Sequence, residues 1–317
     1  MKRIILSLLF IVSFLLNIQG QASDLALTVI VPESSTYLSN SQLQTLQTKI
    51  TQLVNSNGIA AVDYSTNFVI FPVVNIVDES VVEGGMQNIY VVTLDIVFNI
   101  KQLDNNLLFG SWAKSIKGSG KNKEAAVSNA ISQLYSTDKD FKVFIIESKL
   151  KLINYYEKNC SKILEKADFA AQNSRYDEAI AILNAIPQEV KACYTDAQNI
   201  ALVYYKKYQT KICKQSIQEA KSDLAANNYI GVLNTLRYID TESPCSKEVQ
   251  SLMNQAASKV DEEQKKQFDL CMMIYKDAQA LEKMRIDAIK EIGKAYYANQ
   301  PKTITYNNNK NDIIIIK

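Results

Sequence analysis

The sequence predicts an α+β protein, in which a mostly antiparallel sheet with packed helices comes first and an all-α repeat region of helical hairpins follows. Two observations lead to this prediction. Apolar and polar residues alternate over 89–101, and after a short polar turn a second apolar run covers 107–117, which is typical of a β-hairpin. The segment 160–193 recurs in outline at 213–245, which indicates an internal repeat.

Residues 1–22 have the composition of a secretory signal peptide. Lys2 and Arg3 precede an apolar run over 4–16, and the run is followed by small residues. A transmembrane anchor is the alternative, but the apolar run is short for a span of the bilayer. No cysteine lies near the cleavage region, so we expect an exported chain, periplasmic or secreted, without a lipid anchor or a direct membrane span.

Residues 23–140 are expected to form the sheet domain, in which the two hairpin strands pair antiparallel and a helix covers one face. Gly118 and Gly120 precede this helix, and we interpret them as letting the sheet edge pack closely against it. A phosphate cradle is the alternative, but no G-x-x-x-x-G-K-[ST] motif is present. The elements expected besides the hairpin are a strand over 25–32, a helix over 39–57 capped by Ser39, a strand over 67–77 with Pro72 at an edge or interruption, and a helix from near Asn122.

This order of elements carries a resemblance. A strand, a helix, the segment FVIFPVVNIV, a long hairpin and then GSG before an alanine-rich helix resemble the periplasmic α/β domain of curli-secretion CsgG-type proteins, the flagellar assembly protein FlgT and penicillin-binding-protein activators of the LpoB type. The resemblance covers residues 24 to about 140. It implies a domain that is not an enzyme and that assembles at, or braces, machines of the cell envelope. Unlike the lipoprotein members, this chain has no cysteine placed to carry a lipid.

Residues 141–300 are expected to form the helical hairpins. In the first copy an alanine-rich helix, a turn at Asn173 and Ser174, and a second helix stopped by Pro187 follow one another. The segment ADFAAQNSRYDEAIAILNAIP resembles tetratricopeptide-type repeats, but the copies are farther apart than the roughly 34-residue consensus of those repeats. Longer linking helices, such as 189–212, are expected to fill the difference. A third copy begins at Cys271 and then diverges.

Two more helices and a tail complete the expected elements. Residues 141–158 read as an amphipathic helix that bridges sheet and repeats, and 265–297 as one long helix with a charged, solvated face. Residues 301–317 form a β-prone tail, with a hairpin around 307–309 and four isoleucines at 313–316 that are costly to leave in water. These isoleucines either dock on the chain's own sheet, which we favour, or add to a partner's edge strand. The inward positions expected on 141–158 are Ile146, Leu150, Ile153 and Tyr156.

The five cysteines of an exported chain are expected to form disulfides. Cys193 and Cys213 lie on one expected helix, about 30 Å apart at the helical rise, so they cannot bond to each other. Cys160 and Cys193 lie at matching heights on either side of one hairpin turn, as do Cys213 and Cys245. We therefore pair Cys160 with Cys193 and Cys213 with Cys245, and leave Cys271 free. A redox or metal cluster is the alternative, but no C-x-x-C motif is present.

Charge and composition exclude several classes of function. The net charge is +2 and the basic residues are scattered, so no nucleic-acid partner is expected. The chain has no histidine, which removes Ser-His-Asp and Cys-His catalysis, histidine-ligated metal sites and the usual general base. No cofactor is expected. The enzymatic alternative is a cell-wall or glycan-acting hydrolase with paired loop carboxylates, and its candidate residues are Asp63, Asp78, Glu79, Glu83, Asp138 and Asp140.

The interpretation we favour is a non-enzymatic exported protein that binds partner proteins in the assembly or bracing of a cell-envelope structure. Repeated helical hairpins form extended concave surfaces that bind peptides or proteins. Tyrosines are abundant in this region and suit protein interfaces, although filling of the seams between helices is the alternative for them. The expected partners are envelope or outer-membrane-associated proteins. The candidate partner-binding residues are Tyr204, Tyr205, Tyr208, Tyr296 and Tyr297.

Overall fold

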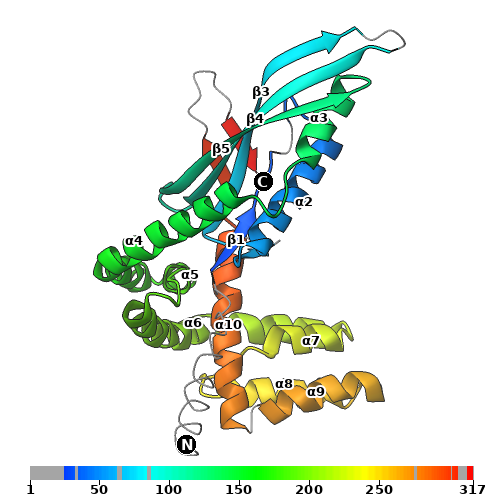
Figure 1. Ribbon diagram of the computed structural model, residues 1–317. Coiled ribbons are helices and arrows are strands. Elements are labelled where there is room, and N and C mark those ends of the chain that lie inside the picture. The colour runs from blue at the N-terminus through cyan, green and yellow to red at the C-terminus, as the bar shows by residue number, and fades with distance from the viewer. Residues whose placement is uncertain are drawn as a thin grey trace, which may run out of the picture.

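The α+β class is confirmed, because a mixed sheet with packed helices forms the first part of the chain and a helical region follows it. Figure 1 shows the sheet at one end, layers of helices at the other, and one long helix, α10, that runs past these layers. The predicted signal peptide, residues 1–22, lies outside the described residues. The computed structural model describes residues 25–32, 35–62, 66–83, 87–274, 277–300, 302–305 and 313–316.

Five strands form the sheet in the order β2-β1-β3-β4-β5. β1 pairs parallel with both of its neighbours, whereas β3, β4 and β5 pair antiparallel, which confirms the predicted hairpin. Pairing between β1 and β3 ends at Ile70, so Pro72 lies in the edge part of β3, where a missing N–H is tolerated. The strands are β1 (Ala26–Val29), β2 (Ala60–Val62), β3 (Phe68–Val82), β4 (Ile89–Gln102) and β5 (Leu108–Gly120).

Three helices cover one face of the sheet and form the main core with it. The alternating residues of β4, among them Leu94, Ile96 and Phe98, are fully buried under these helices. Gly118 allows α3 to approach β5 closely, since a Cβ atom added there would lie 2.1 Å from the carbonyl oxygen of Ala126. The two glycines thus have the packing role predicted for them. The covering helices are α2 (Asn40–Ser56), capped by Ser39, α3 (Lys123–Ser132), capped by Asn122, and α4 (Lys139–Gln172).

Helix α4 is longer than the predicted bridge and belongs to both halves of the molecule. Its first turns pack on β5 through Phe141, Phe144 and Ile145, and its last turns form the first helix of the repeat. The predicted inward positions Ile146 and Leu150 are wrong, because both side chains are exposed. The helix turns the neighbouring aromatic stripe toward Trp112 instead, since larger apolar side chains bury more surface.

The two repeat copies share the same hairpin geometry. Ser174 and Asn227 occupy equivalent positions and both have a left-handed backbone, with φ of 57° and 56°. The N–H groups of the residues that follow them donate to equivalent carbonyl oxygens five residues back, Arg175 to Ala170 and Asn228 to Asp223. The helices are α5 (Tyr176–Asn184), α6 (Lys191–Ala225), α7 (Tyr229–Leu236), α8 (Ser246–Ala257), α9 (Glu262–Ile274) and α10 (Ala278–Ala298).

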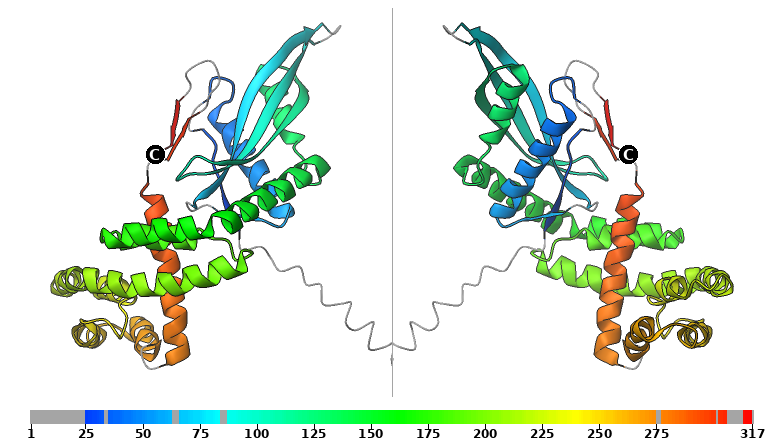
Figure 2. Two further views of the ribbon diagram at one scale, coloured as in Figure 1. Left: turned by 90° about the vertical axis from the view of Figure 1, so that its left-hand side faces the viewer. Right: turned by 90° about the vertical axis from the view of Figure 1, so that its right-hand side faces the viewer.

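The predicted single helix over 265–297 is wrong. Helix α9 ends at Ile274, and α10 begins at Ala278 in a different direction (Figure 1). The side chain of Asp277 accepts a hydrogen bond from the N–H of Ala280, as a helix cap does. The third repeat copy therefore breaks off soon after Cys271, where α9 ends, and α10 turns back along α5 and α6. Figure 2 shows the same helix crossing the layers from the side.

The two largest apolar cores among the described residues do not follow the division into sheet and repeats, and a third, small one lies around Ile30, Val69 and Phe71. The larger core joins the sheet and α2–α4 to α5, to the first half of α6 and to Ala288 and Ile289 of α10. The smaller core lies between the end of α6 and helices α7, α8 and α9. The first hairpin is therefore continuous with the sheet domain, whereas the second hairpin has a core of its own.

The tail contains the predicted β-hairpin. Strand β6 (Lys302–Thr305) pairs antiparallel with β7 (Ile313–Ile316), and the two form a separate two-stranded sheet. The residues predicted for its turn, 307–309, lie outside the described residues. These strands pair with each other and not with the five-stranded sheet, and docking of the isoleucines on that sheet stays a prediction.

Candidate functional site

Three of the five predicted partner-binding tyrosines are buried between helices. The hydroxyl of Tyr205 donates to the carbonyl oxygen of Tyr238 at 3.0 Å, and that of Tyr297 donates to the carbonyl oxygen of Ala181 at 3.2 Å. The hydroxyl of Tyr204 donates to the carboxylate of Asp168. These side chains fill seams in the helical stack and offer no free surface to a partner, which corrects their predicted role.

Tyr208 and Tyr296 are half-buried and lie near the start of α5. Asp177 is close enough to both phenols to raise their pKa values, although burial is the larger cause for each. The ring of Tyr296 also meets the ring of Tyr297 edge to face, at 5.5 Å between centroids. Tyr208 and Tyr296 stay candidates for partner binding, because part of each ring is accessible.

The Tyr204 hydrogen bond leads to a prediction of pH dependence. Burial and the hydrogen bond to the Asp168 carboxylate raise the pKa of Tyr204 to about 12, above the value of about 10 for an unfolded chain. The stabilisation is therefore complete below about pH 10 and is lost as the pH rises through 12. We expect the free energy of unfolding, measured with urea, to fall less steeply with rising alkaline pH in the Tyr204→Phe variant than in the wild type. Exposed Tyr135→Phe is the control, and equal declines in both variants would contradict the assignment.

A cavity of about 420 Å³ lies where the sheet, the first repeat hairpin and α10 meet. Its size is in the range of ligand pockets, which often lie at such junctions. Lys290 and Lys294 line it from α10, and Asn67, Gln188 and Gln198 contribute side-chain amides from the sheet and the repeats. Lys294 also pairs with Glu291 at 2.7 Å. None of the lining residues is acidic, so this cavity does not hold the carboxylate pair of a glycosidase.

The predicted catalytic carboxylates are spread over different elements. Asp78 and Glu79 lie within strand β3 and not in a loop, which is a correction, because β3 is longer than predicted. The carboxylate of Glu79 pairs with Lys123 at 2.6 Å. Glu83 follows the strand and is exposed, and Asp63 lies outside the described residues.

Asp138 has a structural task at the start of α4. Its carboxylate accepts hydrogen bonds from the N–H groups of Asp140 and Phe141 and pairs with Lys114. Burial alone would raise the pKa of Asp138, but the Lys114 and backbone hydrogen bonds outweigh it and give a lowered pKa. The carboxylate is thus ionised near neutral pH, which suits a helix cap and does not suit a general acid.

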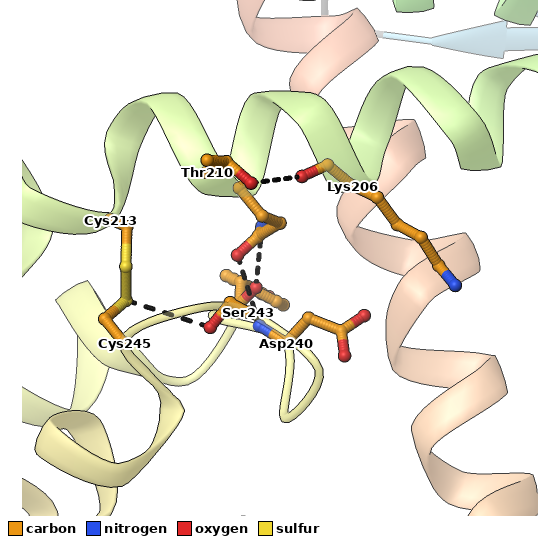
Figure 3. The surroundings of a disulfide bond; sticks show 8 residues. Lys206, Thr210, Cys213, Asp240, Ser243 and Cys245 are labelled. Atoms are coloured by element: carbon orange, nitrogen blue, oxygen red, sulfur yellow. Dashed lines mark hydrogen bonds between the residues drawn. A yellow bond between two sulfur atoms is a disulfide. The ribbon is translucent and has the colours of Figure 1, made fainter.

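Both disulfides join the cysteines that the repeat geometry pairs. Cys160 bonds to Cys193, with 5.8 Å between Cα atoms, and Cys213 bonds to Cys245, with 6.0 Å. Figure 3 shows the second bond linking α6 to the segment before α8. Cys193 and Cys213 lie on the same helix, α6, as expected. Cys271 is free and buried, and burial raises its pKa to about 11, so its thiol is poorly reactive.

One clamp in the helical half was not predicted from the sequence. The carboxylate of Asp240, in the segment between α7 and α8, accepts two hydrogen bonds from the Arg285 guanidinium of α10, at 2.5 and 2.9 Å. Gln209 of α6 binds the same segment, since its amide accepts from the N–H of Asp240 and donates to the carbonyl oxygen of Tyr238. The only sequence signal was that arginine is rare in this lysine-rich chain.

The far end of the β3–β4 hairpin forms an exposed apolar ribbon, by which we mean Val77, Val81 and Val82 of β3 and Ile89 of β4. Their side chains are 46–55% exposed. Val82 stands opposite Ile89, and Val81 opposite Tyr90, so both faces of the ribbon carry apolar side chains. Figure 1 shows the hairpin projecting beyond the covering helices. A group of exposed apolar side chains on a projecting element is a candidate interaction site.

Comparisons with protein-family models, with curated proteins and with solved structures gave no match for this chain. Within the part of the chain that the structure describes, no three His, Cys, Asp or Glu side chains are grouped to hold a metal ion. No helix among the described residues has both the length and the hydropathy for a membrane span.

Proposed function

We propose that this chain is an exported, non-enzymatic protein that binds partner proteins in the assembly or bracing of a cell-envelope structure. The observation that carries the proposal is the projecting apolar ribbon, whose four aliphatic side chains face solvent at the end of a long hairpin. β-branched residues suit strands even without a partner. Apolar side chains on both faces of a projecting hairpin, however, are costly to keep in water unless a partner covers them.

Several features support an exported scaffold. Two disulfides favour an oxidising compartment, periplasmic or extracellular. The first helical hairpin is tied to the sheet by α4, and α10 packs against α5, α6 and α9, so the ribbon projects from a braced body. The resemblance to the envelope domains described above and to tetratricopeptide-type repeats agrees with this role, and residues 1–22 provide the proposed export signal. The proposed partners are envelope or outer-membrane-associated proteins.

A photo-cross-linking experiment in the native envelope tests the ribbon. A photoreactive phenylalanine analogue at position 89 is expected to capture a discrete partner, whereas the same analogue at Val203, an exposed residue of α6, is expected to capture none. Val81→Thr with Val82→Thr keeps the branched shape, removes apolar surface, and is expected to reduce the adduct at least tenfold. Val203→Thr is the matched control. An undiminished amount of adduct in the double variant, or equal adduct from position 203, would contradict the proposal.

A further inference from the structure

The sheet has one edge segment that lacks the usual protection. Sheet edges in soluble proteins are guarded by shortness, charges, proline or bulges, because an open edge can pair with another chain. β2 has three residues, and the edge part of β3 has a bulge and carries Asp78 and Glu79. β5 has a bulge near Phe109 and lysines in its second half. Residues 110–113 lie between them, without charge, proline or bulge.

Helix α4 lies beside this unguarded segment and leaves a groove next to it. A cavity of about 230 Å³ is lined by Gly110, Ser111 and Trp112 of β5 and by Val143, Glu147 and Lys151, one face of α4. Gly110 sets the spacing, since a Cβ atom there would lie 1.9 Å from Oγ of Ser148. The strand and the helix are in contact along this stretch, and no described strand pairs with the outer edge of β5.

The floor of the groove is aromatic. The Trp112 ring stacks on Phe98 and Phe144, with centroids 5.4 and 6.3 Å apart, and meets Phe141 edge to face. Val143 at the rim is 52% exposed, and Leu150, the residue before the groove-lining Lys151, is 60% exposed. Apolar side chains in contact with water thus lie beside a sheet edge with which no described strand pairs. This combination is the one used in recognition by strand addition.

We propose that this groove, between residues 110–113 of β5 and the first half of α4, binds an extended peptide segment of a partner protein as an added strand. The backbone edge requires an extended ligand, and Val143 with Trp112 provides a place for one aliphatic side chain. Asp140 and Glu147 outnumber Lys151 among the lining charges, so the segment has a lysine or arginine beside its aliphatic residue.

This inference deepens the proposed function, on which it rests in part, by naming a second surface and the chemistry of its ligand. The ribbon and the groove lie on different parts of the sheet, one at the free end of β3–β4 and the other beside α4. Loss of cross-linking at position 89 and loss of peptide binding at 110–113 are therefore separate outcomes, and either can occur without the other.

A peptide selection on the mature, disulfide-bonded protein tests the groove. The probe is a random seven-residue library displayed on phage, selected on the wild type and depleted on Val143→Lys. Enriched peptides are expected to combine an aliphatic residue with an adjacent basic residue. Val143→Lys should weaken a labelled synthetic copy at least tenfold, because it removes an apolar contact and repels the basic residue. Val203→Lys, which changes an equally exposed valine on α6, should leave binding within twofold.

Hydrogen exchange with the same synthetic peptide decides where it binds. Added protection of amides in 110–113, with none in 77–82, is expected. Protection of the ribbon amides in place of 110–113 would overturn the proposal. So would a selection in which no peptide is enriched on the wild type after depletion on Val143→Lys. Selected sequences that match the isoleucine-rich residues 313–316, together with a dimer of the intact chain, would assign the groove to a second copy and overturn the partner assignment. Equal thermal unfolding of all variants confirms that they are folded.

Discussion

Replacing Arg285 by methionine is expected to destabilise the helical half of the protein by about 3–5 kcal/mol, the range for breaking a buried ion pair by removing one partner. The side chain of Asp240 is 2% exposed, and Arg285 donates to both of its carboxylate oxygens. Without the guanidinium, a carboxylate stays buried next to Tyr205. The hydrogen bond with Asp240 raises the pKa of Arg285 above its ordinary value, which agrees with a strongly held pair.

Urea unfolding followed by far-UV circular dichroism measures this effect, and Arg175→Met provides the matched control. Arg175 pairs with Glu178 on the surface at 2.7 Å, and such pairs contribute at most about 1 kcal/mol. Adding Asp240→Asn to Arg285→Met should recover part of the loss, because it removes the unpaired charge and keeps an acceptor for the N–H of Glu242. Equal losses in the two arginine variants would show that the clamp contributes no more than a surface pair.

Removal of the disulfides is the second large effect. The bonded cysteines are separated by 33 and 32 residues, so loop-entropy estimates give about 3.7 kcal/mol for each bond. The bonds should differ in what their loss affects. Cys160 and Cys193 belong to the core that includes the sheet, whereas Cys245 packs on the core of α7–α9. We expect Cys213→Ser with Cys245→Ser to loosen α7–α9 first, and Cys160→Ser with Cys193→Ser to lower the stability of the sheet as well.

Alkylation of Cys271 under non-denaturing conditions reports on the smaller core. Its buried thiol should react slowly in the wild type and in the Cys160/Cys193 variant, and rapidly once the Cys213–Cys245 bond is absent. Non-reducing peptide mapping of the wild type should give the two bonds of the structure. A bond between Cys193 and Cys213 would contradict the continuous α6, and unchanged alkylation in both double variants would contradict the separate cores.

Features that depend on local sequence could be predicted well. The alternation in β4, the cap at Ser39 and the glycines before α3 act over a few residues. The cysteine pairs could also be predicted, because two equal hairpins return their ends to the same place. These features establish the fold class and the disulfides of the helical half, but not its binding surfaces.

Features that depend on distant segments could not be predicted. Both the aromatic stripe of α4 and the stripe with Ile146 and Leu150 are apolar, and only the position of Trp112 decides which one is buried. Tyr205 and Tyr208 look alike in sequence, yet only Tyr205 is fully buried. The Arg285–Asp240 pair joins residues 45 positions apart, and no local pattern indicates it. The ribbon and the groove are exposed because no other described segment covers them, which a single segment does not reveal.

The return of α10 also changes how the helical half holds together. In an array of helical hairpins each unit contacts only its neighbours, and such arrays can gain or lose units at their ends. Here α10 makes two hydrogen bonds with α5 of the first hairpin. The hydroxyl of Tyr297 donates to the carbonyl oxygen of Ala181, and the side-chain amide of Asn184 donates to the carbonyl oxygen of Ile289. Arg285 of α10 also binds Asp240, in the segment that follows α7 of the second hairpin. The helical half is therefore a closed ring of contacts, which cannot be shortened from its C-terminal end without uncovering the hairpin next to the sheet.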